Sequence, residues 1–418
     1  MATLRIEGGR RLSGTVAVEG NKNSALPLLA ACLLTDDECV LSNMPRIRDV
    51  EVLVELMRGL GATVDGVGTS TLRVRGGEVR TDRPDPALVG KLRGSVLLLG
   101  PLLARRGAAR LAEPGGDFPT RRTITTHLQA LIAMGAVLFD EPGYVLEAPG
   151  GLTGASMYLD EASVTGTETA LLAAAAAKGR TEIRHAATEP HVAELCRFLR
   201  EMGVGIEGEG TSTIRVEPPA RIGGAGHRLD GDYIEAGSWG VVAAITGGDI
   251  EVRGARAQDM EVIAAPLRKM GLRCAHENDR FTVEGPALTA ARRITTGLWP
   301  GFPSDMVSLV TVLATQADGR TLVHDWLYEL RLFALEQLSA MRADLFLCDP
   351  HRIIVSGPTR LRGRLLDARD LRSGMALIAA ALAAQGESRV TPLETVERGY
   401  GSLVERLRSL GAVVEREE

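Results

Sequence analysis

The chain has 418 residues, of which 45% are hydrophobic and 24% are charged, and its formal net charge is −5. This length suits two domains of about 200 residues each, and the acidic balance argues against nucleic acid or an anionic membrane as a partner. The N-terminal sequence lacks the apolar core of a signal peptide, and the longest apolar run, 375–384, is too short to span a bilayer. We therefore expect a cytoplasmic protein.

Cysteine and histidine placement gives no sign of a disulfide framework or a metal site. The five cysteines are scattered among apolar residues without a CxxC pair, and the seven histidines form no HxxxH or HExxH pattern. Scattered thiols of this kind are typical of a reducing compartment. We expect free thiols and no metal.

A repeat of about 70 residues runs along the whole chain. Each unit begins with a polar loop and an apolar helix that leads into a strand, expected within 24–44, 96–112, 170–186, 240–255, 307–325 and 375–393. An amphipathic helix and a strand pair follow, expected within 54–64, 128–138, 196–206, 266–274, 337–346 and 404–414. The residue that ends this second helix is Gly61, Gly135, Gly203, Gly271, Arg342 or Gly411. Glycine suits this position because it tolerates a left-handed backbone.

The repeat predicts an α/β protein with six βαβαββ-like units. The first helices are apolar nearly all round and so must be buried, whereas the second helices carry charge on one face and cover an outer surface. Three units can enclose their first helices, so six units give two domains with a cleft between them. A linear solenoid is the alternative, which we disfavour because solenoid repeats are usually about 20–45 residues long.

The polar loops at the starts of the buried helices carry the candidate functional residues. Gly20 to Ser24 places Lys22 and Asn23 before an apolar helix, which can form a phosphate seat, although a simple helix cap with a solvated lysine also fits. Gly115-Gly116-Asp117, with paired arginines after it, can be a mobile loop over an anion or an ordinary turn. Comparable loops in other units contain Arg93, Asp232, Glu235, Asp305, Arg331, Asp370, Arg372 and Arg398. Together they suggest a polyanionic substrate with carboxylates for proton transfer.

Over essentially its whole length the chain closely resembles the enolpyruvyl transferases. The motifs that carry the resemblance are GNKNSALPLL, LRGSVLLLGPLLAR, PGGD, EASVTGTET, ATEPHV, GDYIEAGS, PGFPSDM and the DLR and ERGY elements. The resemblance implies two inside-out α/β barrel domains, with the first strand in the C-terminal half and the chain crossing twice. It assigns residues 1–21 with 231–418 to a catalytic domain, and 22–230 to a second domain carrying a mobile loop near 113–123.

The resemblance also implies substrates and residue roles. Phosphoenolpyruvate would be held by Lys22, Arg93, Arg122, Arg331, Arg372 and Arg398. A uridine nucleotide acceptor would be held by Asn23, Arg122, Thr123, Thr125, His127, Ser163, Val164, Thr165 and Asp305. The catalytic residues would be Asp117, Asp305, Lys22 and Arg398. Asp305 would take the proton of the attacking hydroxyl, domain closure would exclude water, and no cofactor is implied.

Asp117 departs from the family pattern, in which a cysteine alkylated by fosfomycin usually stands in this loop. A carboxyl can deliver the proton to C3 of the enol if its pKa is raised, but it cannot form the thioether. We therefore predict a fosfomycin-resistant enzyme.

Further departures cluster on the nucleotide side. The family pattern of proline and aspartate after the loop is replaced by Thr123 and Thr125, the diphosphate loop reads Ser163-Val164-Thr165-Gly166-Thr167, and Glu161 and Tyr233 replace basic residues. We expect transfer to the 3-hydroxyl of UDP-N-acetylglucosamine in peptidoglycan synthesis. The alternative is the 3′-hydroxyl of UMP or a related nucleotide in nucleoside-antibiotic biosynthesis. An inactive nucleotide-sugar sensor is disfavoured by Lys22, Asp305 and Arg398. The sequence leaves the oligomeric state open.

Overall fold

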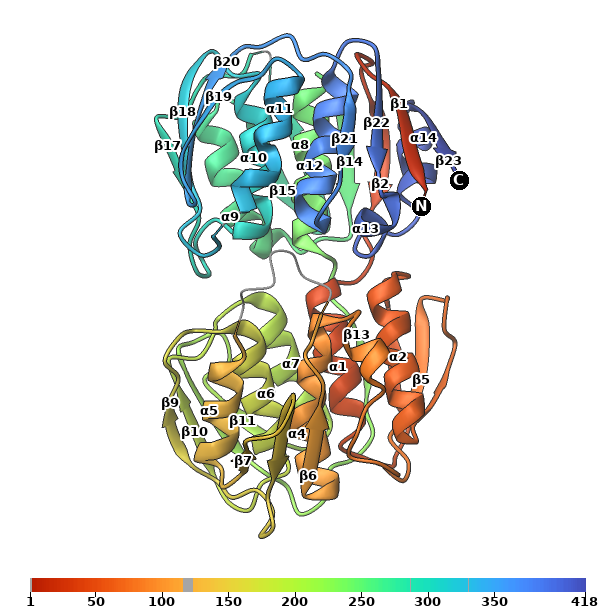
Figure 1. Ribbon diagram of the computed structural model, residues 1–418, viewed down its shortest axis with the longest axis vertical. Helices are drawn as coiled ribbons and strands as arrows, with labels where there is room; N and C mark the ends of the chain where they lie inside the picture. Colours follow the sequence, from red (N-terminus) through yellow and green to blue (C-terminus); the bar gives the residue numbers. More distant parts are fainter. Residues whose placement is uncertain (1, 116–122, 286, 330) are drawn as a thin grey trace. The chain divides into compact units, whose positions relative to one another are not determined.

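The computed structural model describes residues 2–115, 123–285, 287–329 and 331–418 (Figure 1). The chain divides into two compact units. Unit 1 consists of Met1–Glu19 with Gly231–Glu418, and unit 2 consists of Gly20–Asp230.

Unit 2 contains three sheets, each with its own helices, among its described residues. In order across each sheet, the strands are β13 (Gly226–Arg228), β3 (Cys39–Ser42), β5 (Thr71–Arg75) and β4 (Thr63–Asp65); β6 (Ala108–Leu111), β8 (Tyr144–Glu147) and β7 (Val137–Phe139); and β9 (Ser156–Tyr158), β10 (Thr181–Arg184), β12 (Thr213–Glu217) and β11 (Gly205–Glu207). The inner helices are α1 (Lys22–Cys32), η1 (Arg93–Leu98) continuing into α4 (Leu99–Arg106), and α6 (Val164–Ala174). The outer helices are α2 (Arg48–Leu60), α5 (Thr125–Ala133) and α7 (Pro190–Glu201), with a short α3 (Pro86–Val89).

Unit 1 repeats this arrangement. Its strands are β2 (Ser13–Ala17), β14 (Asp249–Arg253), β16 (Arg280–Glu284) and β15 (Arg273–Glu277); β17 (Arg293–Thr295), β18 (Gly319–His324), β20 (Arg352–Gly357) and β19 (Asp344–Asp349); and β21 (Leu365–Asp367), β22 (Glu387–Thr391), β1 (Thr3–Glu7) and β23 (Val413–Glu417). The inner helices are α8 (Tyr233–Ile245), α10 (Val307–Ala314) after η2 (Ser304–Met306), and α12 (Leu371–Ala383). The outer helices are α9 (Ala257–Lys269), η3 (Arg331–Glu336) with α11 (Gln337–Ala340), α13 (Leu393–Glu397) and α14 (Leu403–Ser409).

The apolar first helices form the core of each unit, as their composition predicts. In α12 every residue from Arg372 to Leu382 is buried, and α10 is buried from end to end. The sheets cover these helices with alternating buried and exposed residues, as the pattern of β5 illustrates. The predicted α/β architecture, with six repeats divided three and three, is confirmed, and a linear solenoid is not what the chain forms.

The chain passes from one unit to the other twice, and every strand near these crossings pairs within its own unit. Strand β1, from the N-terminus, lies between β22 and β23 with antiparallel pairing to both, so the first strand belongs to the C-terminal half. Strand β2 leads into α1 of unit 2 but pairs in parallel with β14. Strand β13 leads into α8 of unit 1 but pairs in parallel with β3. Helix α1 therefore begins just after the first crossing, and helix α8 just after the second.

The residue that ends each second helix has a left-handed backbone in all six repeats. The φ angles are +117° at Gly61, +94° at Gly135, +99° at Gly203, +85° at Gly271, +75° at Arg342 and +94° at Gly411. Glycine is the residue that adopts this conformation without strain. The fifth repeat thus carries an arginine at a position that favours glycine.

Replacing Arg342 by glycine is expected to raise the free energy of unfolding by about 0.5–1 kcal/mol, because a left-handed L-residue is strained by about 1–2 kcal/mol. The Arg342 side chain is exposed, so little packing is lost. Urea unfolding measures the change. Arg273→Gly, an exposed arginine within β15, is the matched control and should lower stability. An unchanged or lowered midpoint for Arg342→Gly would contradict the expectation.

Candidate functional site

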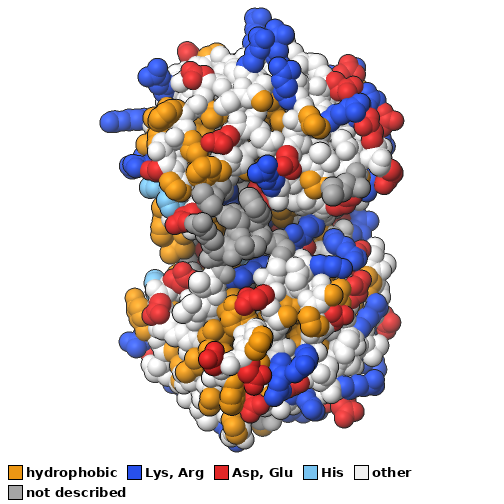
Figure 2. Space-filling view, viewed as in Figure 1, with side chains coloured by type: hydrophobic (Ala, Val, Ile, Leu, Met, Phe, Trp, Pro, Cys, Tyr) orange, Lys and Arg blue, Asp and Glu red, His pale blue; other side chains and the backbone are white. Residues whose placement is uncertain are grey.

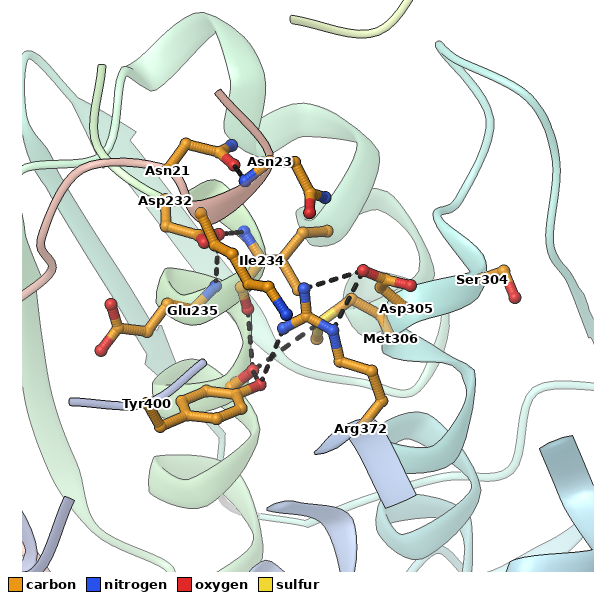
Figure 3. Close-up of polar contacts among 12 residues, drawn as sticks. Asn21, Asn23, Asp232, Ile234, Glu235, Ser304, Asp305, Met306, Arg372 and Tyr400 are labelled. Atoms are coloured by element: carbon orange, nitrogen blue, oxygen red, sulfur yellow. Dashed lines mark hydrogen bonds and ion pairs between the residues drawn. The ribbon is translucent and has the colours of Figure 1, made fainter. Parts of the chain in front are cut away.

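Asp305 contacts two arginines of unit 1, and Figure 3 shows its contact with one of them, Arg372. It is in η2, just before the buried helix α10. Arg372 places Nε 3.0 Å and Nη2 2.8 Å from Oδ2 of Asp305, and Arg331 places Nη1 3.2 Å from Oδ1. The side chain of Asp305 is 26% exposed, whereas those of Arg331 and Arg372 are 16% and 7% exposed. Both oxygens of the Asp305 carboxylate therefore accept from guanidinium groups, in bonds that are stronger than those between neutral groups.

Neighbouring tyrosines contact both arginines, and Tyr400 beside Arg372 is fully buried. The hydroxyl of Tyr400 accepts a bond from Arg372 Nη1 at 3.3 Å and lies 2.8 Å from Oγ of Ser238. Burial opposes the charge of Arg372, but Asp305 and Tyr400 favour it, and the net effect raises the pKa of Arg372 above its ordinary value. Arg331 lies over the ring of Tyr328, with 4.4 Å from Cζ to the ring centroid.

Acidic residues cap two of the three inner helices of unit 1. Asp232 accepts from the backbone amides of Ile234 at 2.9 Å and Glu235 at 3.0 Å, at the start of α8 (Figure 3). Asp370 caps α12 in the same way. Burial raises the pKa of Glu235 to about 7, although its ion pair with Arg406 on α14 opposes that shift.

In unit 2, Lys22 begins α1 and is fixed by an ion pair. Its Nζ lies 2.7 Å from Oδ2 of Asp49, in the first turn of α2, and its side chain is only 14% exposed. The side chain of Asn21 caps the helix by accepting from the amide of Asn23 at 2.8 Å. The alternative of a simple helix cap with a solvated lysine does not describe this loop, because Asn21 is the cap and Lys22 is ion-paired. A cation at a helix start, where amides also carry partial positive charge, suits an anion.

The residues expected on the nucleotide side gather at the starts of α5 and α6. Nε2 of His127 lies 2.8 Å from Oγ1 of Thr165, and Ser163 caps α6 by accepting from the amide of Gly166 at 3.2 Å. Thr125 and Val164 are the first residues of these two helices. Arg93 donates from Nη2 to the carbonyl of Thr123 at 2.8 Å. The hydroxyl of Thr126 donates to Glu161 at 3.2 Å, which places a carboxylate beside the same helix starts.

The protonation of His127 gives a measurable pH dependence. Burial, with a contribution from Arg93, lowers the pKa of His127 from 6.5 to about 4. The unfolded chain therefore binds a proton that the folded chain refuses, and stability falls as the pH drops from 6.5 to 4. The loss should reach about 3 kcal/mol, at 1.36 kcal/mol per pH unit. The measurement is the urea midpoint of the wild type and of His127→Gln at several pH values in this range. The midpoint of the variant should depend much less on pH than that of the wild type. The same pH dependence of the midpoint in both proteins would contradict the prediction.

Two of the predicted site residues lie outside the described part of the chain. These are Asp117 and Arg122, in the loop expected near 113–123. Arg398 is half-buried at the end of α13, where its amide donates to the carbonyl of Glu394 at 3.2 Å. The sequence reasoning missed Tyr400, Ser238 and Asp325, which support the arginines. Asp325 follows directly after an alternating strand, and an acid in that place is the signal that could have singled it out.

Other features of the described residues limit the kind of site. Among residues 2–115, 123–285, 287–329 and 331–418, the His, Cys, Asp and Glu side chains form no group of three that could hold a metal ion. None of the helices in these ranges has the length and apolarity to cross a membrane. Figure 2 shows that acidic and basic side chains are intermixed over the visible face.

Comparisons with known proteins place these observations in a family. The family model described as EPSP synthase (3-phosphoshikimate 1-carboxyvinyltransferase) matches residues 6–407. The fold and the arginine-rich site therefore define an enolpyruvyl transferase, and the chain belongs to the EPSP synthase family of these enzymes.

Named relatives cover the whole chain. UDP-N-acetylglucosamine 1-carboxyvinyltransferase of Bradyrhizobium diazoefficiens is 42% identical over 98% of this chain and 97% of its own length. The enzyme of the same name from Treponema denticola is 39% identical over 99% of each chain. Among solved structures, the enolpyruvyl transferase NikO from Streptomyces tendae has a TM-score of 0.89 at 27% identity, covering 99% of this chain and 98% of that one. EPSP synthase from Acinetobacter baumannii, with a TM-score of 0.77 at 20% identity over both full chains, shares the fold.

Proposed function

We propose that the protein transfers the enolpyruvyl group of phosphoenolpyruvate to the 3-hydroxyl of UDP-N-acetylglucosamine, with release of phosphate. The observation that carries the proposal is Asp305, a partly exposed carboxylate fixed by Arg331 and Arg372 at the start of a buried helix. Its support is the full-length similarity to the two relatives of that name. The product would serve peptidoglycan precursor synthesis, and we propose a cytoplasmic location.

The reaction is an addition followed by an elimination. Asp305 takes the proton of the acceptor hydroxyl as its oxygen attacks C2 of the enol, and an acid delivers a proton to C3. The resulting tetrahedral intermediate then expels phosphate and loses the C3 proton to give the enol ether. We propose Asp117, which lies outside the described residues, as the acid. Cations are required because the phosphate and carboxylate of phosphoenolpyruvate must be neutralised during both steps.

Each unit supplies part of this machinery in the proposal. Unit 1, the proposed catalytic domain, provides Asp305 with Arg331, Arg372 and Arg398. Unit 2 provides the remaining phosphoenolpyruvate residues Lys22, Arg93 and Arg122, and its acceptor residues are Asn23, Thr123, Thr125, His127, Ser163, Val164 and Thr165. The hydrogen bonds that fix His127, Thr165 and Ser163 support an acceptor site at the starts of α5 and α6. Amides at helix starts are suited to a nucleotide phosphate.

A uridine monophosphate is the second candidate acceptor, and the position of Glu161 favours it. This exposed carboxylate, bonded to Thr126, lies beside the starts of α5 and α6. A carboxylate in place of a basic residue leaves one phosphate group of a diphosphate without a cation, and a monophosphate has no second phosphate group to neutralise. Steady-state phosphate release with UDP-N-acetylglucosamine and with UMP, compared as kcat/KM, decides between them. Activity with only UMP would overturn the sugar-nucleotide proposal, and activity with neither would favour a non-catalytic nucleotide-sugar sensor.

Glu161→Gln is expected to raise kcat/KM for UDP-N-acetylglucosamine about three- to tenfold, because it removes one exposed like charge near the diphosphate. The gain should shrink at high salt. Glu182→Gln, another carboxylate of unit 2 that pairs with Arg215, is the matched control and should leave kcat/KM unchanged. Equal responses of the two variants would show that Glu161 does not face the nucleotide.

A further inference from the structure

Asp325 is a fully buried carboxylate at the end of a pair of parallel strands. Strands β17 and β18 pair with Thr295 opposite His324, so the next residues, Thr296 and Asp325, emerge side by side. Asp325 is 0% exposed and Thr296 is 3% exposed. Burying a carboxylate costs several kcal/mol unless its oxygens receive good hydrogen bonds. The role of Asp325 can therefore be inferred from its hydrogen-bond partners.

The hydrogen bonds of Asp325 have a fixed direction, since an ionised carboxylate only accepts. Oδ1 accepts from the Thr296 hydroxyl at 2.8 Å and from the amide of Leu327 at 3.3 Å. Oδ2 accepts from the hydroxyl of Ser304 at 2.7 Å. Ser304 has a single hydroxyl proton, and this bond uses it.

The hydroxyl of Ser304 can then only accept on its other side, where Arg331 donates to it. The distance from Nη1 of Arg331 to Oγ of Ser304 is 2.7 Å, shorter than the 3.2 Å from the same nitrogen to Oδ1 of Asp305. A hydroxyl facing the opposite way would present its proton to the guanidinium and repel it. By accepting the Ser304 proton, Asp325 turns a lone pair of the Ser304 hydroxyl toward Arg331.

We propose that Asp325 is a positioning residue, which orients the Ser304 hydroxyl and through it fixes the Arg331 guanidinium against Asp305. This inference rests on the proposed function, because it assigns Asp305 and Arg331 to the reaction. Asp325 itself contacts neither of them in this chain of bonds. Two hydrogen bonds link Asp325 to Arg331 by way of Ser304, and a third joins Nη1 of Arg331 to the Asp305 carboxylate.

The test is a double-mutant cycle on the purified full-length enzyme with phosphoenolpyruvate and the acceptor it turns over. Asp325→Asn and Ser304→Ala are each expected to lower kcat/KM by about ten- to a hundredfold, and the double variant should lose no more than about threefold beyond the worse single variant. Thr296→Val removes the other hydroxyl bond to the same carboxylate. It should lower the melting temperature but keep kcat/KM within about threefold of the wild type.

Two kinetic outcomes would overturn the proposal. Multiplicative losses in the double variant would mean that Asp325 does not act through Ser304, and a Thr296→Val loss equal to that of Asp325→Asn would mean a merely structural carboxylate. If the wild type releases no phosphate, the proposed function is rejected, but the positioning role of Asp325 can still be tested. Crystal structures of Asp325→Asn, or of Ser304→Ala if the first variant does not fold, then decide. A guanidinium of Arg331 displaced from Asp305 supports the inference, and an unmoved one overturns it.

Discussion

Asp305→Asn is expected to lower kcat about 10²–10⁴-fold, the usual contribution of a positioned general base. Asparagine has nearly the same shape but cannot take the proton of the acceptor hydroxyl. It also removes the negative charge that Arg331 and Arg372 share, so one buried guanidinium loses its partner. Such a loss costs about 3–5 kcal/mol in a buried pair. Steady-state kinetics and a melting curve of the same sample separate the two effects.

The control for this variant is Asp367→Asn. Asp367 pairs with Arg369 on the surface of the same unit, with side chains about half exposed, and should affect neither kcat nor stability appreciably. A kcat for Asp305→Asn within a few-fold of the wild type, in a folded protein, would remove Asp305 from the role of base.

The second large effect is expected at Asp117, whose structure lies outside the described residues. The wild type should keep full activity after prolonged incubation with fosfomycin, because a carboxylate does not form the thioether that the family's loop cysteine forms. Asp117→Cys should be inactivated irreversibly and in a time-dependent manner, with the inhibitor mass added to the protein, since a thiolate is the better nucleophile.

Asp117→Asn is the matched variant for the proton-transfer role. It should lower kcat about 10²–10⁴-fold, whereas Asp117→Cys should retain much of the activity, because only the amide lacks a proton to donate. Progressive inactivation of the wild type by fosfomycin would contradict the predicted resistance. An active Asp117→Asn variant would contradict the role of Asp117 as the general acid.

Local pattern was sufficient to predict six α/β repeats in two domains, whereas the place of the first strand and the two crossings came from the family resemblance. Each repeat buries an apolar helix and ends its amphipathic helix in a left-handed residue, and both features depend on short-range periodicity and backbone preference. Arg342 shows the limit of that reasoning, because the structure keeps the left-handed turn where glycine is missing.

The partners of the site residues were not predictable in the same way. Lys22 is fixed by Asp49, and Arg331 by Ser304, through contacts that depend on how separate elements pack. The role of Asp325 follows from the register of β17 and β18, which no single segment encodes. The sequence also did not identify Asn21 as the cap of α1, because several adjacent polar residues are possible caps and propensity does not choose between them.

The most direct test of the proposed function is phosphate release by the purified protein with phosphoenolpyruvate and UDP-N-acetylglucosamine, with the product mass recorded. We expect release that requires both substrates, and a product that is the acceptor plus an enolpyruvyl group. Phosphate release independent of the acceptor, or no release with any uridine nucleotide, would contradict the assignment of this chain as a uridine-nucleotide enolpyruvyl transferase.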